Sequence, residues 1–137
     1  MQQPKSLAQK RVEALLRAAD RDVEMAETAE RYSPHLYENI GFNCQQAVEK
    51  YAKCVLMANG FPAPFTHVLV KLLSPLLQNA IIRLDPDEID AAAILQDFAV
   101  EWRYETDSSP SYASADLLAM ALQFRKKLRP LAVAFLV

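Results

Sequence analysis

Apolar residues recur at steps of three and four along most of the chain, which is the spacing of one face of an α-helix. Two long stripes come first and predict helices over about residues 5–31 and 35–59. Pro34 disfavours helix in the residue before it, and Gly60 can take the left-handed position after a helix, so both serve as stops. The stripe residues are Val12, Leu15, Leu16, Ala19, Val23 and Ala26 in the first helix, and Tyr37, Ile40, Cys44, Ala47, Val48, Tyr51, Ala52, Val55 and Leu56 in the second.

Three shorter helices are expected in the rest of the chain. Thr66 is a suitable N-cap for the first of them, and Pro75 is expected to kink or split it. The next has the clearest start in the chain, because Asp85 can cap a helix with Pro86 at N1 and Glu88 at N3. The inward stripe of that helix is expected to be Ile89, Ala92, Leu95, Ala99 and Trp102.

The last helix is expected over about residues 114–128, and Pro130 should end or bend it. No strand-like alternation of useful length occurs, and the chain has only 2 Gly, which disfavours turn-rich all-β folds. Its 137 residues, 52% of them hydrophobic, fit a single domain over residues 1–137. The sequence therefore predicts an all-α fold, an up-and-down bundle of four to five helices.

Charge excludes one class of function and leaves another open. A net charge of −2 and a pI near 5.7 exclude a globally basic nucleic-acid-binding protein. Residues 84–116 hold nine acids and one base, whereas residues 117–137 hold four bases and no acid. Those four bases are either a solvated helix end, favoured by the C-terminal dipole, or a phosphate-contacting patch. They are Arg125, Lys126, Lys127 and Arg129.

Export and metal signals are not found in the sequence. The N-terminal residues have no apolar core, and the apolar run at 131–137 falls far short of the roughly 20 residues that span a bilayer. We therefore expect a cytoplasmic protein that does not enter the membrane.

Cys44 and Cys54 lie about 15 Å apart on one predicted helix, too far for a disulfide within the chain. Neither a zinc-site spacing nor a glycine-rich phosphate loop occurs, so no metal and no cofactor is expected.

One stretch of the chain is more specific. The second predicted helix carries Gln45-Gln46-Ala47-Val48-Glu49-Lys50-Tyr51-Ala52-Lys53. Thr66-His67 follows at the expected start of the next helix, and Arg103-Tyr104 comes later. This ordered set resembles the HEPN domain family, whose name stands for higher eukaryotes and prokaryotes nucleotide-binding. The resemblance extends over most of the chain, from the first helix to about Tyr104.

The resemblance implies a fold and a range of functions. Family members are helical bundles and are often dimeric, and many are encoded beside a small nucleotidyltransferase with which they form toxin–antitoxin pairs. Some cleave RNA without metal, and others are proposed only to bind nucleotides. We therefore expect a small HEPN-like protein that acts by binding, with a nucleotide, a nucleotidyltransferase or both as partners, and that is not an enzyme.

The ribonuclease branch of the family carries an Arg and a His separated by four to six intervening residues. Here no His follows Arg103, and the pair Arg31 and His35 is one residue too close. Histidine can act as acid or base near neutrality, so its loss removes the usual route to metal-free RNA cleavage. A metal-independent RNase with a degenerate site and a structural adaptor without ligand remain the alternative hypotheses.

The same motif supplies the candidate site. Glu49 is expected to pair with Lys53 one helical turn away, and a partly buried pair with Arg103 is expected to fix helix register. His67 either packs and caps locally or helps hold an anion at a helix N-terminus. The candidates for nucleotide or phosphate binding are Lys50, Lys53, His67, Arg103 and Tyr104, and the expected structural polar residues are Gln45, Gln46 and Glu49.

The apolar end of the chain predicts self-association. Residues 131–137 follow the basic stretch, and a short helix there cannot hide all of its apolar atoms. Contiguous exposed apolar surface usually marks an interface, so we expect a homodimer that uses the last helix and the tail.

Overall fold

The computed structural model of the chain describes residues 3–99 and 112–137. Within these ranges it holds five α-helices, one short 3-10 turn and no strand. The elements are α1 (Leu7–Tyr32), α2 (Tyr37–Ala58), α3 (Leu69–Gln78), α4 (Pro86–Gln96), η1 (Asp97–Ala99) and α5 (Ser114–Phe135). The predicted all-α helical bundle is confirmed.

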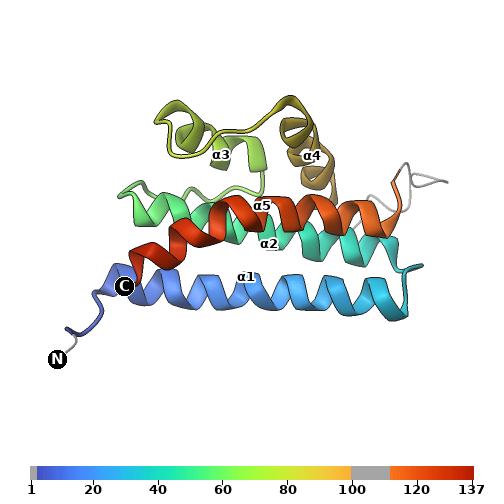
Figure 1. Cartoon of the computed structure of the whole chain (residues 1–137), viewed down its shortest axis with the longest axis horizontal. Coiled ribbons are helices and arrows are strands. Elements are labelled where there is room, and N and C mark those ends of the chain that lie inside the picture. Colours follow the sequence, from blue (N-terminus) through green and yellow to red (C-terminus); the bar gives the residue numbers. More distant parts are fainter. Residues whose placement is uncertain (1–2, 100–111) are drawn as a thin grey trace.

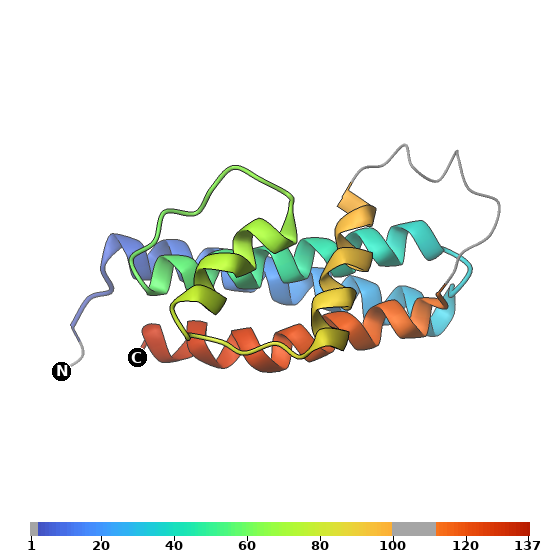
Figure 2. The same cartoon turned by 90° about the horizontal axis from the view of Figure 1, so that it is seen from above.

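Three long helices form the body of the molecule. α1, α2 and α5 lie side by side, and α1 runs opposite to both α2 and α5 (Figure 1). The shorter α3 and α4 cover the side of α2 and α5 that is remote from α1, and α4 crosses α2 and α5 at a steep angle (Figure 2). The chain's two ends lie at the same end of the bundle.

α2 is the centre of the core. Most of the stripe predicted on it is buried, and its neighbours α1 and α5 bury their own stripes against it. Each fully buried Leu, Ile or Val side chain stabilises the fold by about 1.5–3 kcal/mol. Cys44 and Cys54 are both free and buried, and burial raises the pKa of each thiol to about 12.

Helix ends follow local sequence signals. The expected capping box of α4 is present: Asp85 Oδ1 accepts the Glu88 N–H, and Glu88 Oε1 accepts the Asp85 N–H. Gly60 has φ +78° and closes α2, with the Phe61 N–H bonded to the Leu56 carbonyl at 2.9 Å. Ala80 takes the same left-handed position after α3, with φ 54°, although no glycine marked it in the sequence.

α3 begins later than the sequence predicted. Its N-cap is Val68 and its first residue is Leu69, so Thr66 does not cap it and His67 lies before the helix. The Thr66 hydroxyl instead accepts the Val68 N–H at 3.1 Å, and the Gln45 side chain donates to the His67 carbonyl at 3.2 Å. Both bonds hold the backbone before Leu69 in a non-helical turn.

Neither internal proline ends its helix. α3 continues through Pro75 and does not split there. α5 continues through Pro130 to Phe135, so the expected end near residue 128 is wrong, whereas the bend expected as the alternative at Pro130 is present (Figure 1). The final turns of α5 are kept by the burial of Ala132 and by the Gln9 side chain, which donates to the Phe135 carbonyl at 3.0 Å. Over these turns α5 bends away from its earlier direction (Figure 1).

α4 is turned relative to the predicted stripe. Ile89 is 46% exposed, whereas Glu88, Ala91, Ala92 and Leu95 are buried. Glu88 faces α5, where Lys127 and Gln123 donate to its carboxylate, and this pairing leaves Ile89 outside. Trp102, the last residue of the expected stripe, lies outside the described residues.

A glycine allows an aromatic ring to lie directly on α2. A Cβ on Gly41 would lie 2.3 Å from Cδ1 of Phe98, so the ring occupies the space of a side chain. The Phe98 ring also meets Tyr37 edge-on, with centroids 5.3 Å apart. Phe98 is therefore a core aromatic.

Candidate functional site

A buried carboxylate on α2 organises the candidate site. Glu49 is 4% exposed and accepts three side-chain hydrogen bonds. Gln45 Nε2 and His67 Nδ1 donate to Oε1 at 3.1 and 2.8 Å, and Lys53 Nζ donates to Oε2 at 3.1 Å. We call these four residues, together with Gln46, the Glu49 cluster.

Periodicity places most of the cluster on one side of α2. Gln45, Glu49 and Lys53 follow one another at intervals of four residues, so they lie along one line of the helix. Gln46 Nε2 donates to Gln45 Oε1 at 2.7 Å, which leaves the Gln45 amide nitrogen free to donate to Glu49. The two glutamines thereby fix the position of the carboxylate, the structural role expected for them.

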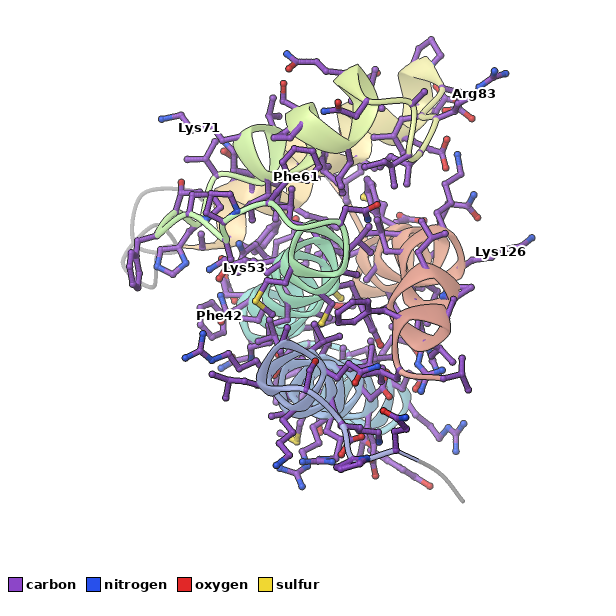
Figure 3. All side chains as sticks on the ribbon, turned by 90° about the vertical axis from the view of Figure 1, so that its left-hand side faces the viewer. Phe42, Lys53, Phe61, Lys71, Arg83 and Lys126 are labelled. Atoms are coloured by element: carbon purple, nitrogen blue, oxygen red, sulfur yellow. The ribbon has the colours of Figure 1, made fainter. Side chains whose placement is uncertain are left out.

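His67 reaches the cluster from the connection between α2 and α3. Gln45 holds its carbonyl, and the turn at Thr66 sets the direction of the backbone there. The imidazole side chain is 68% exposed, whereas Lys53 is 18% exposed. Lys53 lies on α2 beside this connection, close to the part of the chain that carries Phe61 (Figure 3).

Hydrogen bonding keeps the carboxylate charged. Burial raises the pKa of Glu49, but the bonds from His67, Gln45 and Lys53 outweigh burial, so that the net pKa lies below its usual value. An ionised carboxylate can only accept hydrogen bonds, so His67 Nδ1 carries a proton in this pair. In the neutral ring the other nitrogen, Nε2, is then a free acceptor on an exposed side chain.

The structure does not bring all the candidate residues together. Lys50 Nζ lies 2.5 Å from Asp22 Oδ2 of α1, so Lys50 pairs across the α1–α2 interface and does not join Lys53. Arg103 and Tyr104 lie outside the described residues, and so does the expected Glu49–Arg103 pair.

Sequence reasoning missed a second polar cluster at the junction of three helices. Asp20 of α1 accepts the Tyr51 hydroxyl of α2 at 2.5 Å and the Arg129 guanidinium of α5 at 3.0 and 2.8 Å. Burial raises the pKa of Asp20, but the bonds from Arg129 and Tyr51 outweigh it and lower the net pKa. One signal was available: a Tyr in a core stripe needs a partner for its hydroxyl. We call these three residues the Asp20 cluster.

The Glu49 cluster can perform two kinds of chemistry. An ammonium and an exposed imidazole held by one carboxylate can bind a phosphate group through charge-assisted hydrogen bonds. A His bonded to a carboxylate can also take up or release a proton near neutral pH.

Among the described residues, no group of three or more His, Cys, Asp or Glu could hold a metal ion. None of the helices in residues 3–99 and 112–137 is long and apolar enough to cross a membrane.

The fold and this cluster define a small helical-bundle protein with a polar surface site on its central helix. The sequence model of the HEPN domain matches residues 12–131, so the chain belongs to the HEPN domain family. No curated protein matches the chain.

Two solved structures are similar to this one. The archaeal HEPN homologue ST0689 has a TM-score of 0.63 at 22% identity, with 90% of this chain and 97% of that chain covered. The protein TT1696 from Thermus thermophilus has a TM-score of 0.60 at 23% identity, with 92% and 95% covered. At these identities the likeness shows the fold alone.

Proposed function

We propose that this HEPN protein binds a nucleotide, or another small ligand that carries a phosphate, at the Glu49 cluster. The observation that carries the proposal is one buried carboxylate that holds Lys53 and a largely exposed His67 together at the surface. Lys53 has three donors, of which Glu49 takes one, so a phosphate oxygen can accept from the same ammonium.

The ammonium of Lys53 favours an anionic ligand at this place, because Glu49 accepts only one of its three N–H donors. The ring nitrogen of His67 that does not face Glu49 offers a second polar contact. The neighbouring Gln45 and Gln46 are occupied in holding Glu49, so Lys53 and His67 are the groups that contact the ligand. Arg103 and Tyr104, which the family resemblance adds, are further candidates for the same ligand.

The test compares two lysine variants in calorimetric titrations with a panel of nucleotides. Lys53→Ala should weaken binding about tenfold, because one charge-assisted bond to phosphate is lost. Lys71→Ala is the matched control, since Lys71 is exposed on α3 and lies outside the cluster. Equal affinities for the two variants would contradict the proposal, and no binding by wild type would favour a structural adaptor without ligand.

The family also supplies a cellular context for this proposal. A small nucleotidyltransferase is the partner that the resemblance favours, in a toxin–antitoxin-type pair in the cytoplasm. Co-expression with the product of a neighbouring nucleotidyltransferase gene should yield a complex that survives size-exclusion chromatography. Separate elution of the two proteins would remove this partner from the proposal.

The bond between His67 and Glu49 also favours a second function, metal-independent RNA cleavage. His67 Nε2 would accept the proton of a ribose 2′-hydroxyl, whose oxygen attacks the adjacent phosphorus, while Lys53 stabilises the phosphate charge. The bond from phosphorus to the 5′-oxygen of the next nucleotide then breaks, which gives a 2′,3′-cyclic phosphate, and the 5′-oxygen leaves with a proton from water. Cleavage of single-stranded RNA in the presence of EDTA, lost in His67→Ala, is the expected result for this function. RNA that stays intact with wild type leaves binding alone.

A further inference from the structure

One aromatic side chain is fully exposed close to the Glu49 cluster. Phe65 is more exposed than any other large hydrophobic residue in residues 3–99 and 112–137. A single exposed apolar residue on a helix is ordinary, because a small protein cannot cover all of its apolar surface. Phe65 differs from that case, since it lies in the connection between α2 and α3, two residues before His67.

The backbone on either side of Phe65 is restrained. Pro62 and Pro64 fix two φ angles before it, which limits the conformations open to the connection. The Thr66 N–H donates to the Pro64 carbonyl at 3.0 Å, so Phe65 is the central residue of a three-residue turn. An exposed ring on a restrained turn is ready to meet a ligand, because little conformational freedom is lost on binding.

The same connection brings Phe65 to the Glu49 cluster. It runs along the outside of α2 (Figure 2). At its start the Phe61 N–H bonds a carbonyl in the last turn of α2, and towards its end Gln45 donates to the His67 carbonyl. The chain therefore runs back along α2 from the end of that helix to the cluster. The Cα atoms of Phe65 and His67 are at most about 7 Å apart, since only two residues separate them.

We propose that Phe65 stacks on the base of a nucleotide whose phosphate is bound by Lys53 and His67. This inference rests on the proposed function, and it adds that the ligand carries an aromatic base beside its phosphate. Stacking uses only the flat face of the base, which every nucleobase has. The site therefore prefers nucleotides to sugar phosphates and inorganic phosphate, and it discriminates little between one base and another.

The surroundings of the ring favour a nucleotide over a partner protein. A protein interface surrounds its aromatic anchor with other contacts and buries about 800 Å² on each partner. The next exposed large hydrophobic residue along the chain is Val70 on α3, and the groups that adjoin Phe65 on the other side belong to the polar Glu49 cluster. One exposed ring beside phosphate-binding donors corresponds to the two ends of a nucleotide.

The experiment compares two ligands that differ only in the base, adenosine 5′-monophosphate (AMP) and ribose 5-phosphate, in calorimetric titrations. Wild type should bind AMP about tenfold more tightly, because a stacked base contributes about that factor. Phe65→Ala should weaken AMP about tenfold and leave ribose 5-phosphate unchanged. Phe65→Trp keeps an aromatic face and should retain the preference for AMP. Lys53→Ala should weaken both ligands, because both carry the phosphate.

Tyr32→Ala is the matched control, since Tyr32 is an exposed aromatic residue at the end of α1 and lies outside the cluster. It should leave both affinities unchanged. Because the Phe65 side chain is fully exposed, Phe65→Ala should melt at the same temperature as wild type.

The outcomes separate this inference from the proposed function. Equal affinities of wild type for AMP and ribose 5-phosphate overturn the inference, as does an AMP affinity that Phe65→Ala does not lower. If Lys53→Ala still weakens both ligands in that case, the phosphate site is retained without the stacked base. Wild type that binds neither ligand overturns both proposals.

A strand of RNA offers the same base and phosphate as a free nucleotide, and a short RNA oligonucleotide distinguishes the two sources. Equal affinities for AMP and the oligonucleotide, both lowered by Phe65→Ala, assign the ring to a free nucleotide. An oligonucleotide that binds about tenfold more tightly than AMP, and is weakened by the same variant, assigns it to a base within a strand.

Discussion

The Asp20 cluster and the Glu49 cluster are each built on one carboxylate that accepts hydrogen bonds from its partners, but they connect different parts of the molecule. Asp20 joins side chains of α1, α2 and α5. Glu49 binds two residues of its own helix and one from the connection before α3. Tyr51 in the first cluster is fully buried, whereas His67 in the second is largely exposed.

This difference indicates separate roles. Removing Asp20 disconnects three helices and leaves a buried hydroxyl without an acceptor, which is costly to the fold. Removing a donor to Glu49 leaves the helices in place, because no other long helix depends on the bond. The Asp20 cluster therefore contributes mainly to the stability of the fold. The Glu49 cluster can present Lys53 and His67 at the surface with only a modest effect on the free energy of unfolding.

The largest expected effect comes from Asp20→Ala. The Tyr51 hydroxyl and the Arg129 guanidinium both lose their partner, so the free energy of unfolding should fall by about 3 kcal/mol and the melting temperature by about 10 °C. Glu13→Ala is the control on the same helix, since its ion pairs with Lys5 and Arg17 are exposed and should contribute little to stability. Thermal melting that shows equal losses would mean that the bond to the buried Tyr51 hydroxyl adds nothing to the stability that an ion pair on the surface provides.

Glu88 extends the comparison to acid pH, because it joins α4 to α5 as Asp20 joins its three helices. Burial raises its pKa, but donation from Lys127, the Asp85 N–H and Gln123 outweighs burial and lowers the pKa from 4.5 to about 2. A lowered pKa means stability that is present above about pH 4.5 and is lost as the pH falls towards 2. The contribution is on the order of 3 kcal/mol.

Glu88→Gln should remove this part of the acid sensitivity. The amide can still accept the Asp85 N–H, so the helix cap is retained while the charge pair with Lys127 is lost. Urea unfolding at a series of pH values should show a lower stability at pH 7 and a flatter curve between about pH 4.5 and 2. A curve parallel to that of wild type would contradict the low pKa.

Substitution of one cation in each cluster should distinguish the role in stability from the role in binding. Arg129→Ala leaves Asp20 with Tyr51 alone; this ion pair is partly exposed, so the free energy of unfolding should fall by about 1 kcal/mol, with nucleotide affinity unchanged. Lys53→Ala leaves the buried Glu49 with two donors and should cost about 1–2 kcal/mol, while nucleotide affinity falls. Melting curves and titrations give a stability and a nucleotide affinity for each variant. The opposite pattern of affinities would exchange the roles of the two clusters.

The smallest effect is expected for Gln46→Ala. Gln46 is half-buried and acts on Glu49 only through Gln45, so stability should change by less than about 1 kcal/mol. Affinity for a nucleotide should fall about two- to threefold, because the Gln45 amide can then rotate away from Glu49. An effect on binding as large as that of Lys53→Ala would mean that Gln46 contacts the ligand itself.

Much of the candidate site could be predicted because its parts lie one helical turn apart. The intervals between Gln45, Glu49 and Lys53 can be read from the sequence, and they are the ones that share a helix face. The family resemblance added His67 but placed it in the first turn of α3. The bond from Gln45 to the His67 carbonyl, across 22 residues, keeps it out of the helix and brings its ring to Glu49.

The sequence by itself determined the helices, the core stripes of the long helices and the cap at Asp85, because these depend on residues within one or two turns of each other. Tertiary structure alone decided the Asp20 cluster, which joins Asp20 to Arg129 across 109 residues. It also separated Lys50 from Lys53 and turned Ile89 outward. These outcomes depend on which distant partner satisfies each buried polar group, and that choice is made only when the helices pack.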